Sequence, residues 1–246
     1  MKETRFLSLA FFCLRPSSKY CWLFRHVKPV DDKTIRGLPS LPLRAMITVN
    51  KHSLRTGSMA SERCGWVTAD PLYLDYHDKE WGAPTTAARE LFEMLCLEGQ
   101  QAGLSWITVL KKRENYRRAF HNFDPQRVAA MTEQDVETLL QDSGIIRHRG
   151  KIEAIIANAR AYLAMEAAGE DFSAFIWGFV GGEPQLNGWQ ALSQVPAKTE
   201  LSDALSKALK KRGFKFIGST ICYAFMQACG LVNDHLTGCI CYPKQK

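Results

Sequence analysis

The feature that most constrains the fold is the dense succession of helix signals along residues 61–246. Asp124 stands before a proline in an N-cap pattern, and Thr132 with Asp135 gives a second capped helix start. Residues 150–163 place isoleucine, alanine and leucine on one face of a long amphipathic helix. No run of alternating residues predicts a strand, and no repeat recurs at a fixed period. The pattern predicts an all-α fold.

Further helices are expected over three more apolar or amphipathic segments, residues 87–97, 104–110 and 218–229. Ser202 is the expected start of another helix, which ends in two lysines and an arginine followed by Gly213. Cations in the last turn and a glycine just beyond it are typical of a helix end. We expect residues 59–246 to form one compact domain or two closely packed lobes.

The positive charge of the chain lies in its first quarter. Residues 1–58 hold 11 Lys and Arg against 3 Asp and Glu, a net charge of +8, whereas the other 188 residues hold 21 against 22, a net charge of −1. Residues 6–14 are largely apolar and follow two cations, as in a secretory signal, but no small-residue cleavage site comes after them. We interpret residues 1–58 as a disordered or non-native extension, with Met59 as the natural start. A targeting peptide and a basic arm that holds DNA are the alternatives.

Composition excludes several classes of protein. Hydrophobic residues make up 46% of the chain, too many for a disordered protein. No apolar run approaches the ~20 residues that span a bilayer, so we expect no membrane association. Eight cysteines in 246 residues are too few for a small disulfide scaffold.

Two cysteines and two histidines could form a metal site that joins the two ends of the body. Cys64 and His77 lie near its start, and His235 and Cys239 lie near its end with three residues between them. Two thiolates and two imidazoles are a ligand set that zinc favours in closed structural sites. Cys241 is an alternative thiol, and four ordinary buried residues are the alternative to a metal site. The other cysteines of the body, Cys96, Cys222 and Cys229, are expected in the core.

Aromatic residues gather around one carboxylate, Glu98. Four of them fall within sixteen residues and a fifth lies downstream: Trp66, Tyr73, Tyr76, Trp81 and Trp106. Aromatic faces stack on flat bases, and a carboxylate among them would be desolvated and able to take part in hydrogen bonding or acid–base chemistry. The alternative is that the rings fill the core and Glu98 lies at the surface.

A glycine-containing turn joins two amphipathic segments near residues 136–163 and is typical of a helix-hairpin-helix. Backbone amides around Gly144 and the start of the following helix could hold a DNA phosphate. Arg147, Arg149 and Lys151 add positive charge there, in a body that is otherwise neutral. An ordinary helix–helix turn with solvated cations is the alternative.

Taken together, these stretches closely resemble the Tag-type 3-methyladenine DNA glycosylases of bacterial base-excision repair. The matching strings occur in order from about residue 61 to the C-terminus: RCGW (63–66), YHD (76–78), EWG (80–82), LEGQQAGLSW (97–106), GIIRHRGK (144–151) and GLVNDH (230–235). Nothing in residues 1–58 takes part.

The resemblance implies an α-helical helix-hairpin-helix glycosylase fold with one structural zinc ion on Cys64, His77, His235 and Cys239. It implies that Glu98 recognises the damaged base as the catalytic residue and that Tyr76 and Trp106 sandwich that base. Trp66, Tyr73 and Trp81 complete the pocket. The expected DNA contacts are Leu104, as a wedge in the vacated base stack, with Gly144, Ile145, Arg147, Arg149 and Lys151.

The resemblance also implies the reaction. Related glycosylases use an aspartate beyond the hairpin, which residues 163–166 do not offer, and lyase-type relatives use a hairpin lysine. Here the nearest equivalent is His148, with Lys151 further on. We therefore expect a monofunctional hydrolase that flips 3-methyladenine out of duplex DNA and excises it without strand cleavage. We expect a cytoplasmic monomer. The alternative function is a zinc-stabilised protein that binds lesions without excising them.

Overall fold

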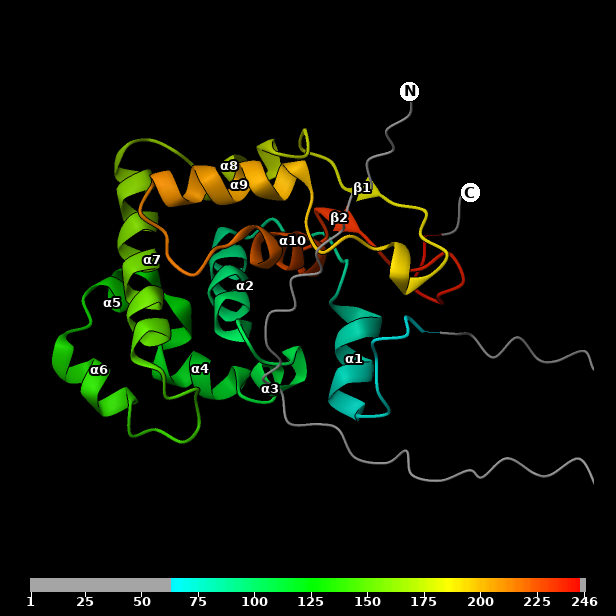
Figure 1. The fold of residues 1–246 in the computed structure, drawn as a ribbon. Helices are drawn as coiled ribbons and strands as arrows, with labels where there is room; N and C mark the ends of the chain where they lie inside the picture. Colours follow the sequence, from blue (N-terminus) through cyan, green and yellow to red (C-terminus); the bar gives the residue numbers. More distant parts are fainter. Residues whose placement is uncertain (1–62, 244–246) are drawn as a thin grey trace, which may run out of the picture. The chain divides into compact units, whose positions relative to one another are not determined.

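The computed structural model describes residues 63–243, and the extension expected over residues 1–58 lies outside them. The described residues belong to one compact unit, built almost entirely of helices (Figure 1). The first half holds α1 (Pro71–Lys79), α2 (Ala88–Gln101), α3 (Trp106–Leu110), α4 (Arg113–Ala119), a 3-10 turn (His121–Phe123), α5 (Pro125–Ala129) and α6 (Glu133–Leu139). The second half holds α7 (Arg149–Ala167), α8 (Phe172–Gly178), β1 (Gln185–Leu186), a 3-10 turn (Leu192–Gln194), α9 (Glu200–Lys211), α10 (Ser219–Ala228) and β2 (Val232–Asn233).

Side-chain caps set the helix starts, largely where the sequence predicts them. Asp124 accepts hydrogen bonds from two amides at the start of α5, and Thr132 forms a capping box with Asp135 at the start of α6. The expected start of α9 at Ser202 was wrong. Thr199 is its N-cap, and Ser202 is the third helical residue, whose side chain closes the capping box.

The core forms around α2. Leu91, Phe92 and Leu95 on this helix are fully buried, and α7 and α10 pack against it. Helix α9 covers α10, and α5 packs along α7 (Figure 1). Cys96, Cys222 and Cys229 are buried in this core, as expected. The packing holds the C-terminal half of α2 between helix α10 and the turn that leads into α7, residues 140–148.

Two short strands are the exception to the all-α prediction. β1 and β2 pair in parallel, with Gln185 opposite Val232 and Leu186 opposite Asn233. Two residues are too few to show the alternation by which a strand is predicted. The pairing ties the segment after α8 to the C-terminal residues that follow α10. None of the helices in residues 63–243 is long and apolar enough to cross a membrane.

Two glycines allow close approaches that fix the ends of this unit. Gly230 follows α10 with φ +69°, and a Cβ there would lie 2.5 Å from the backbone of Ala83 and Pro84. Gly82 has φ +81°, and a Cβ there would lie 3.1 Å from the His235 ring. Only glycine fits such positions without strain. The strings EWG and GLVNDH therefore bring the two ends of the body into contact.

Candidate functional site

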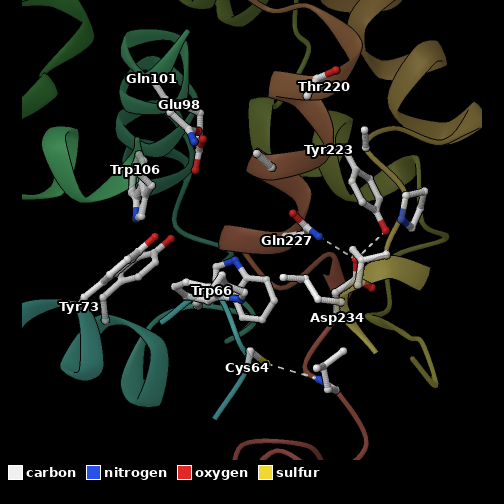
Figure 2. A pocket seen from close by; sticks show the side chains of 18 residues that line it. Cys64, Trp66, Tyr73, Glu98, Gln101, Trp106, Thr220, Tyr223, Gln227 and Asp234 are labelled. Atoms are coloured by element: carbon white, nitrogen blue, oxygen red, sulfur yellow. Dashed lines mark hydrogen bonds between the residues drawn. The ribbon is translucent and has the colours of Figure 1, made fainter. Parts of the chain in front are cut away.

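A cavity of about 420 Å³ opens between α1 and α2 on one side and α10 on the other. Figure 2 shows the side chains that converge on it from these helices and from the segment after β2. Its walls include Trp66, Tyr73, Tyr76, Trp81, Glu98, Gln101, Trp106, Val195, Thr220, Tyr223, Gln227 and Asp234. The structure thus brings all five aromatic residues predicted from the sequence to one cavity, together with Glu98.

Glu98 is buried on α2, with 3% of its surface exposed. Its Oε2 atom has no hydrogen-bond partner among the described residues. Burial alone raises the pKa of Glu98 to about 8, because the low-dielectric interior disfavours its charged form. The alternative of a surface position for Glu98 was wrong. A buried carboxyl oxygen without a partner is costly, and a ligand in the cavity would supply the missing partner.

Trp106 carries a second buried polar atom, its indole Nε1, for which residues 63–243 provide no partner. Its ring lies 5.5 Å from that of Tyr76, at an interplanar angle of 47°. A base stacked between two rings needs about 7 Å, two carbon contacts of about 3.5 Å each. The two rings therefore touch each other here and would have to separate to sandwich a base.

The other aromatic residues form a second cluster on the floor of the cavity. The ring of Trp66 lies 5.1 Å from that of Tyr73 and 5.0 Å from that of Trp81. Trp81 also stacks against His77 at 6.2 Å. This cluster joins the cavity to the cysteines and histidines behind it.

Sequence reasoning missed a second buried carboxylate in the cavity wall, Asp234. It is 1% exposed. Four groups donate to it: Asn187 and Trp189 to Oδ1 at 2.7 and 2.9 Å, and Tyr223 and Gln227 to Oδ2 at 2.6 and 2.8 Å. The donors come from the segment after β1 and from α10. Asp234 directly precedes the candidate ligand His235, and that adjacency is the signal that could have pointed to it.

The four predicted metal ligands come together at one buried place. Cys64, His77, His235 and Cys239 each offer one ligand atom, and these atoms lie within 4.8 Å of one another. Cys239 Sγ lies 3.5 Å from His77 Nε2 and 3.5 Å from His235 Nδ1, and Cys64 Sγ lies 3.6 Å from His235 Nδ1.

This donor set fits a zinc ion. Tetrahedral bonds of about 2.3 Å to sulfur and about 2.05 Å to nitrogen place the two donors about 3.6 Å apart, as found here. Burial raises the pKa of the Cys64 thiol to about 12, so its thiolate would need a nearby cation. Cys241 lies on the other side of the His77 ring, 3.9 Å from Nδ1. The geometry thus favours Cys239 as the second thiol.

Further contacts orient the two histidines. His77 Nδ1 lies 2.8 Å from a carboxyl oxygen of Asp78. The two oxygens of this carboxylate also accept a bidentate pair of hydrogen bonds from Arg63. That guanidinium holds the pKa of the Asp78 carboxyl well below its usual range. His235 Nε2 donates to the carbonyl of Trp81 at 2.9 Å. Such partners are usual behind metal-binding imidazoles.

The predicted hairpin connects α6 to α7 through residues 140–148. Gly144 donates its amide to Asp142 Oδ1 at 2.7 Å, and Ile145 is a buried core residue. These two residues stabilise the turn from inside, and the DNA contacts expected of them stay predictions. The backbone amides of Arg147, Arg149 and Gly150 donate to no group in the part of the chain that the structure describes.

The three cations of the hairpin have different surroundings. Arg147 is exposed and makes none of the ion pairs found in residues 63–243. The guanidinium of Arg149 is shared by Glu133, Glu137 and Glu153, which neutralise it.

The side chain of Lys151 faces the protein interior, and the DNA contact expected of this residue stays a prediction. Lys151 is 5% exposed, and its Nζ donates to the carbonyls of Gln100 and Ala102 at 2.7 Å each. Its ammonium therefore neutralises the carboxyl end of α2. Gln100 donates back to the Lys151 carbonyl at 3.1 Å. These contacts fasten the start of α7 to the helix that carries Glu98.

Leu104 lies in the short loop between α2 and α3. It is 41% exposed, so it is a surface residue and not part of the core. Gly103 precedes it with φ +78°, a left-handed conformation that glycine adopts without strain. Leu104 lies between Gln101 and Trp106, which line the cavity, and its role as a wedge stays a prediction.

Comparisons with known proteins agree with this geometry. The family model described as methyladenine glycosylase matches residues 66–242. The chain is 70% identical over 185 residues to DNA-3-methyladenine glycosylase 1 of Escherichia coli, covering 75% of this chain and 99% of that protein. It is 64% identical over 179 residues to the DNA-3-methyladenine glycosylase of Haemophilus influenzae, covering 73% and 97%.

Solved structures show the same likeness. A crystal structure of 3-methyladenine DNA glycosylase I is 70% identical and matches with a TM-score of 0.73 over 74% of this chain and all of that one. The Staphylococcus aureus enzyme, described in terms of 3-methyladenine recognition, is 43% identical and matches with a TM-score of 0.73 over 76% and 100%.

Proposed function

Because this chain belongs to the methyladenine glycosylase family, we propose that the cavity beside Glu98 receives the damaged base. The protein is a DNA-3-methyladenine glycosylase, a hydrolase of N-glycosyl bonds that excises 3-methyladenine in base-excision repair. The alternative of a lesion-binding protein without activity is therefore set aside. The observation that supports the placement is the pair of buried polar atoms without partners, Glu98 Oε2 and Trp106 Nε1, on one aromatic cavity.

Charge complementarity explains why a methylated base would be held there. Methylation at N3 leaves the base cationic while it is attached to the sugar. Electron-rich rings attract such a cation, by about 2 kcal/mol when it is desolvated. The same cation would favour the ionised form of Glu98, whose pKa burial raises to about 8 in the free protein. Neutral adenine gains neither contribution.

The reaction requires little acid catalysis from the protein. When the N-glycosyl bond breaks, its electron pair moves to the base and cancels the positive charge, while water adds its hydroxyl group to C1′ and releases its other proton to solvent. Glu98 and the aromatic rings hold the base in position. The cavity that they line keeps solvent from competing for the hydrogen bonds of the base. We propose that no lysine attacks the sugar, because the Lys151 ammonium is occupied by two carbonyls. The enzyme is thus a monofunctional glycosylase in this proposal.

We propose that duplex DNA binds across a helix-hairpin-helix formed by α6, α7 and the turn between them. The amides of residues 147, 149 and 150, which donate to no group within residues 63–243, would hold a phosphate at the start of α7 together with the exposed Arg147. Leu104 would fill the gap left by the extracted base. We expect the enzyme to act as a monomer in the bacterial cytoplasm.

We propose that Cys64, His77, His235 and Cys239 hold one structural zinc ion. Such an ion would provide cross-links between the two ends of the body, next to the aromatic floor of the cavity. Metal analysis of purified protein tests the site, with one zinc per chain as the expected result. Cys239→Ala should abolish zinc binding, and Cys241→Ala is the matched control that should retain it. Full retention by Cys239→Ala would overturn this ligand set.

Release of the free base from methylated DNA tests the placement of the substrate. We expect wild-type protein to release 3-methyladenine and leave the strand intact. Free 3-methyladenine should quench the tryptophan emission of the cavity and inhibit release competitively. A base that binds without affecting the cavity tryptophans would contradict the proposed site.

A further inference from the structure

Phe216 is an exposed aromatic residue in a strained backbone conformation. It lies in the loop between α9 and α10, is 39% exposed and has φ +53°. Its neighbours Phe214 and Ile217 are 2% and 1% exposed. Bulky residues rarely adopt positive φ, because the Cβ atom then clashes with the backbone. The chain thus buries two apolar residues of this loop and holds the third outward at an energetic cost.

Hydrogen bonds hold the loop on both sides of Phe216. The side chain of Asn158, which is buried on α7, accepts from the Lys215 amide at 2.7 Å and donates to the Lys215 carbonyl at 3.3 Å. Ser206 Oγ donates to the Ile217 carbonyl at 2.6 Å. Strained residues that their surroundings fix in this way are concentrated at functional sites.

Phe216 lies between the helix that carries Glu98 and the start of α7. A Cβ on Gly99 would lie 3.2 Å from the Phe216 carbonyl oxygen, so glycine lets the loop contact α2. A Cβ on Gly150 would lie 3.7 Å from the Phe216 ring. The His148 ring lies 6.2 Å from the Phe216 ring in an edge-on arrangement. Phe216 is therefore an immediate neighbour of the hairpin.

Leu104 belongs to the same neighbourhood. The Lys151 ammonium, at the start of α7, binds the carbonyl of Ala102, two residues before Leu104. Leu104 and Phe216 are thus exposed apolar side chains on either side of one junction, where α2, α7 and the loop after α9 meet. The exposed Lys215 and Arg147 add positive charge beside them.

We propose that Phe216 is a second apolar contact with duplex DNA, beside Leu104. This inference rests on the proposed binding of DNA across the hairpin. Inserted apolar side chains unstack base steps and stabilise bent DNA, and aromatic rings also stack on exposed bases. Leu104 fills the place of the extracted base, and the ring of Phe216 packs against a neighbouring nucleotide. The fixed, strained loop presents the ring before DNA arrives.

The test is the affinity for a duplex that contains a stable abasic-site analogue, measured by fluorescence anisotropy. Phe216→Asn removes the ring and suits a left-handed backbone. We expect it to weaken DNA binding about 10-fold, the size of one base–aromatic stack. Its affinity for free 3-methyladenine and its Tm should stay at or above the wild-type values. Leu186→Asn, at a similarly exposed leucine on β1, is the matched control and should bind DNA normally.

Unchanged DNA affinity of Phe216→Asn would overturn the inference. Should that variant fail to fold, Phe216→Gly also accepts positive φ and provides the same measurement. Leu104→Ala and Arg147→Ala separate this outcome from failure of the proposed DNA face. If they weaken binding while Phe216→Asn does not, only the role of Phe216 is wrong. If all three bind normally, the proposed DNA face is wrong and the inference fails with it.

Discussion

Two carboxylates, Glu98 and Asp234, line the same cavity with almost equal burial, at 3% and 1% exposure. Asp234 accepts hydrogen bonds from four side chains. Glu98 has an oxygen without a partner and a pKa raised by burial to about 8. Burial therefore does not distinguish a structural group from a ligand-binding one. Hydrogen-bond satisfaction does in the proposed site, because Glu98 has an oxygen left to pair with a ligand, whereas the oxygens of Asp234 already accept from four donors.

The largest expected effect is on stability at Asp234. Asp234→Ala leaves four donors facing a small gap, and the free energy of unfolding should fall by about 4 kcal/mol, since each buried unpaired group costs about 1–3 kcal/mol. Glu98→Ala is the matched variant and should cost far less. Urea denaturation of both variants gives the comparison. Equal losses would show that the two carboxylates are structurally equivalent.

The next effect is on excision at Glu98. Glu98→Gln keeps the shape but removes the charge that attracts the cationic base, so release of 3-methyladenine should slow about 100-fold, as when one key electrostatic contact is lost. Affinity for abasic DNA should change less than twofold. Single-turnover release from methylated DNA measures the rate. A variant that turns over at the wild-type rate would remove Glu98 from the mechanism.

A smaller effect is expected in the pH dependence of stability. Burial raises the pKa of Glu98 from 4.5 to about 8, so the folded state binds more protons than the unfolded state between these values. Stability from this group is therefore lost as the pH rises through that window. As the pH rises from about 5.5 to about 7, the free energy of unfolding of Glu98→Gln should increase by about 2 kcal/mol relative to that of the wild type. A pH-independent difference between the two would mean that Glu98 ionises normally.

The smallest effect compares two tryptophans. Trp189 Nε1 donates to Asp234, whereas Trp106 Nε1 has no partner in the described part of the chain. Trp189→Phe should therefore lower the free energy of unfolding by about 1 kcal/mol, and Trp106→Phe should leave it nearly unchanged. Trp106→Phe should instead weaken binding of free 3-methyladenine several-fold. Thermal unfolding and base titration of both variants measure this. The reverse pattern would contradict the distinction between the two carboxylates.

The sequence by itself determined the helices and the identity of the chemical groups. Caps such as Thr132 with Asp135 are local, and their spacing along the chain is sufficient to predict them. The strings that carry Cys64, His77, Glu98, Trp106 and His235 were enough to indicate the family. The predicted metal ligands do meet in one cluster, because the close approaches at Gly82 and Gly230 bring the two ends of the body together.

Only the tertiary structure decided which side chains are buried and which hydrogen-bond partners they have. Lys151 reads as a DNA contact in the sequence, but packing of α7 against α2 buries its ammonium on two carbonyls. Apart from its place beside His235, no local pattern indicates the role of Asp234, because its donors lie up to 47 residues away in the chain. In the sequence Phe216 cannot be told from a core phenylalanine. In the structure, hydrogen bonds to Lys215 and Ile217 hold the loop so that Phe216 is exposed. Burial and hydrogen-bond satisfaction depend on long-range contacts, and local sequence does not contain them.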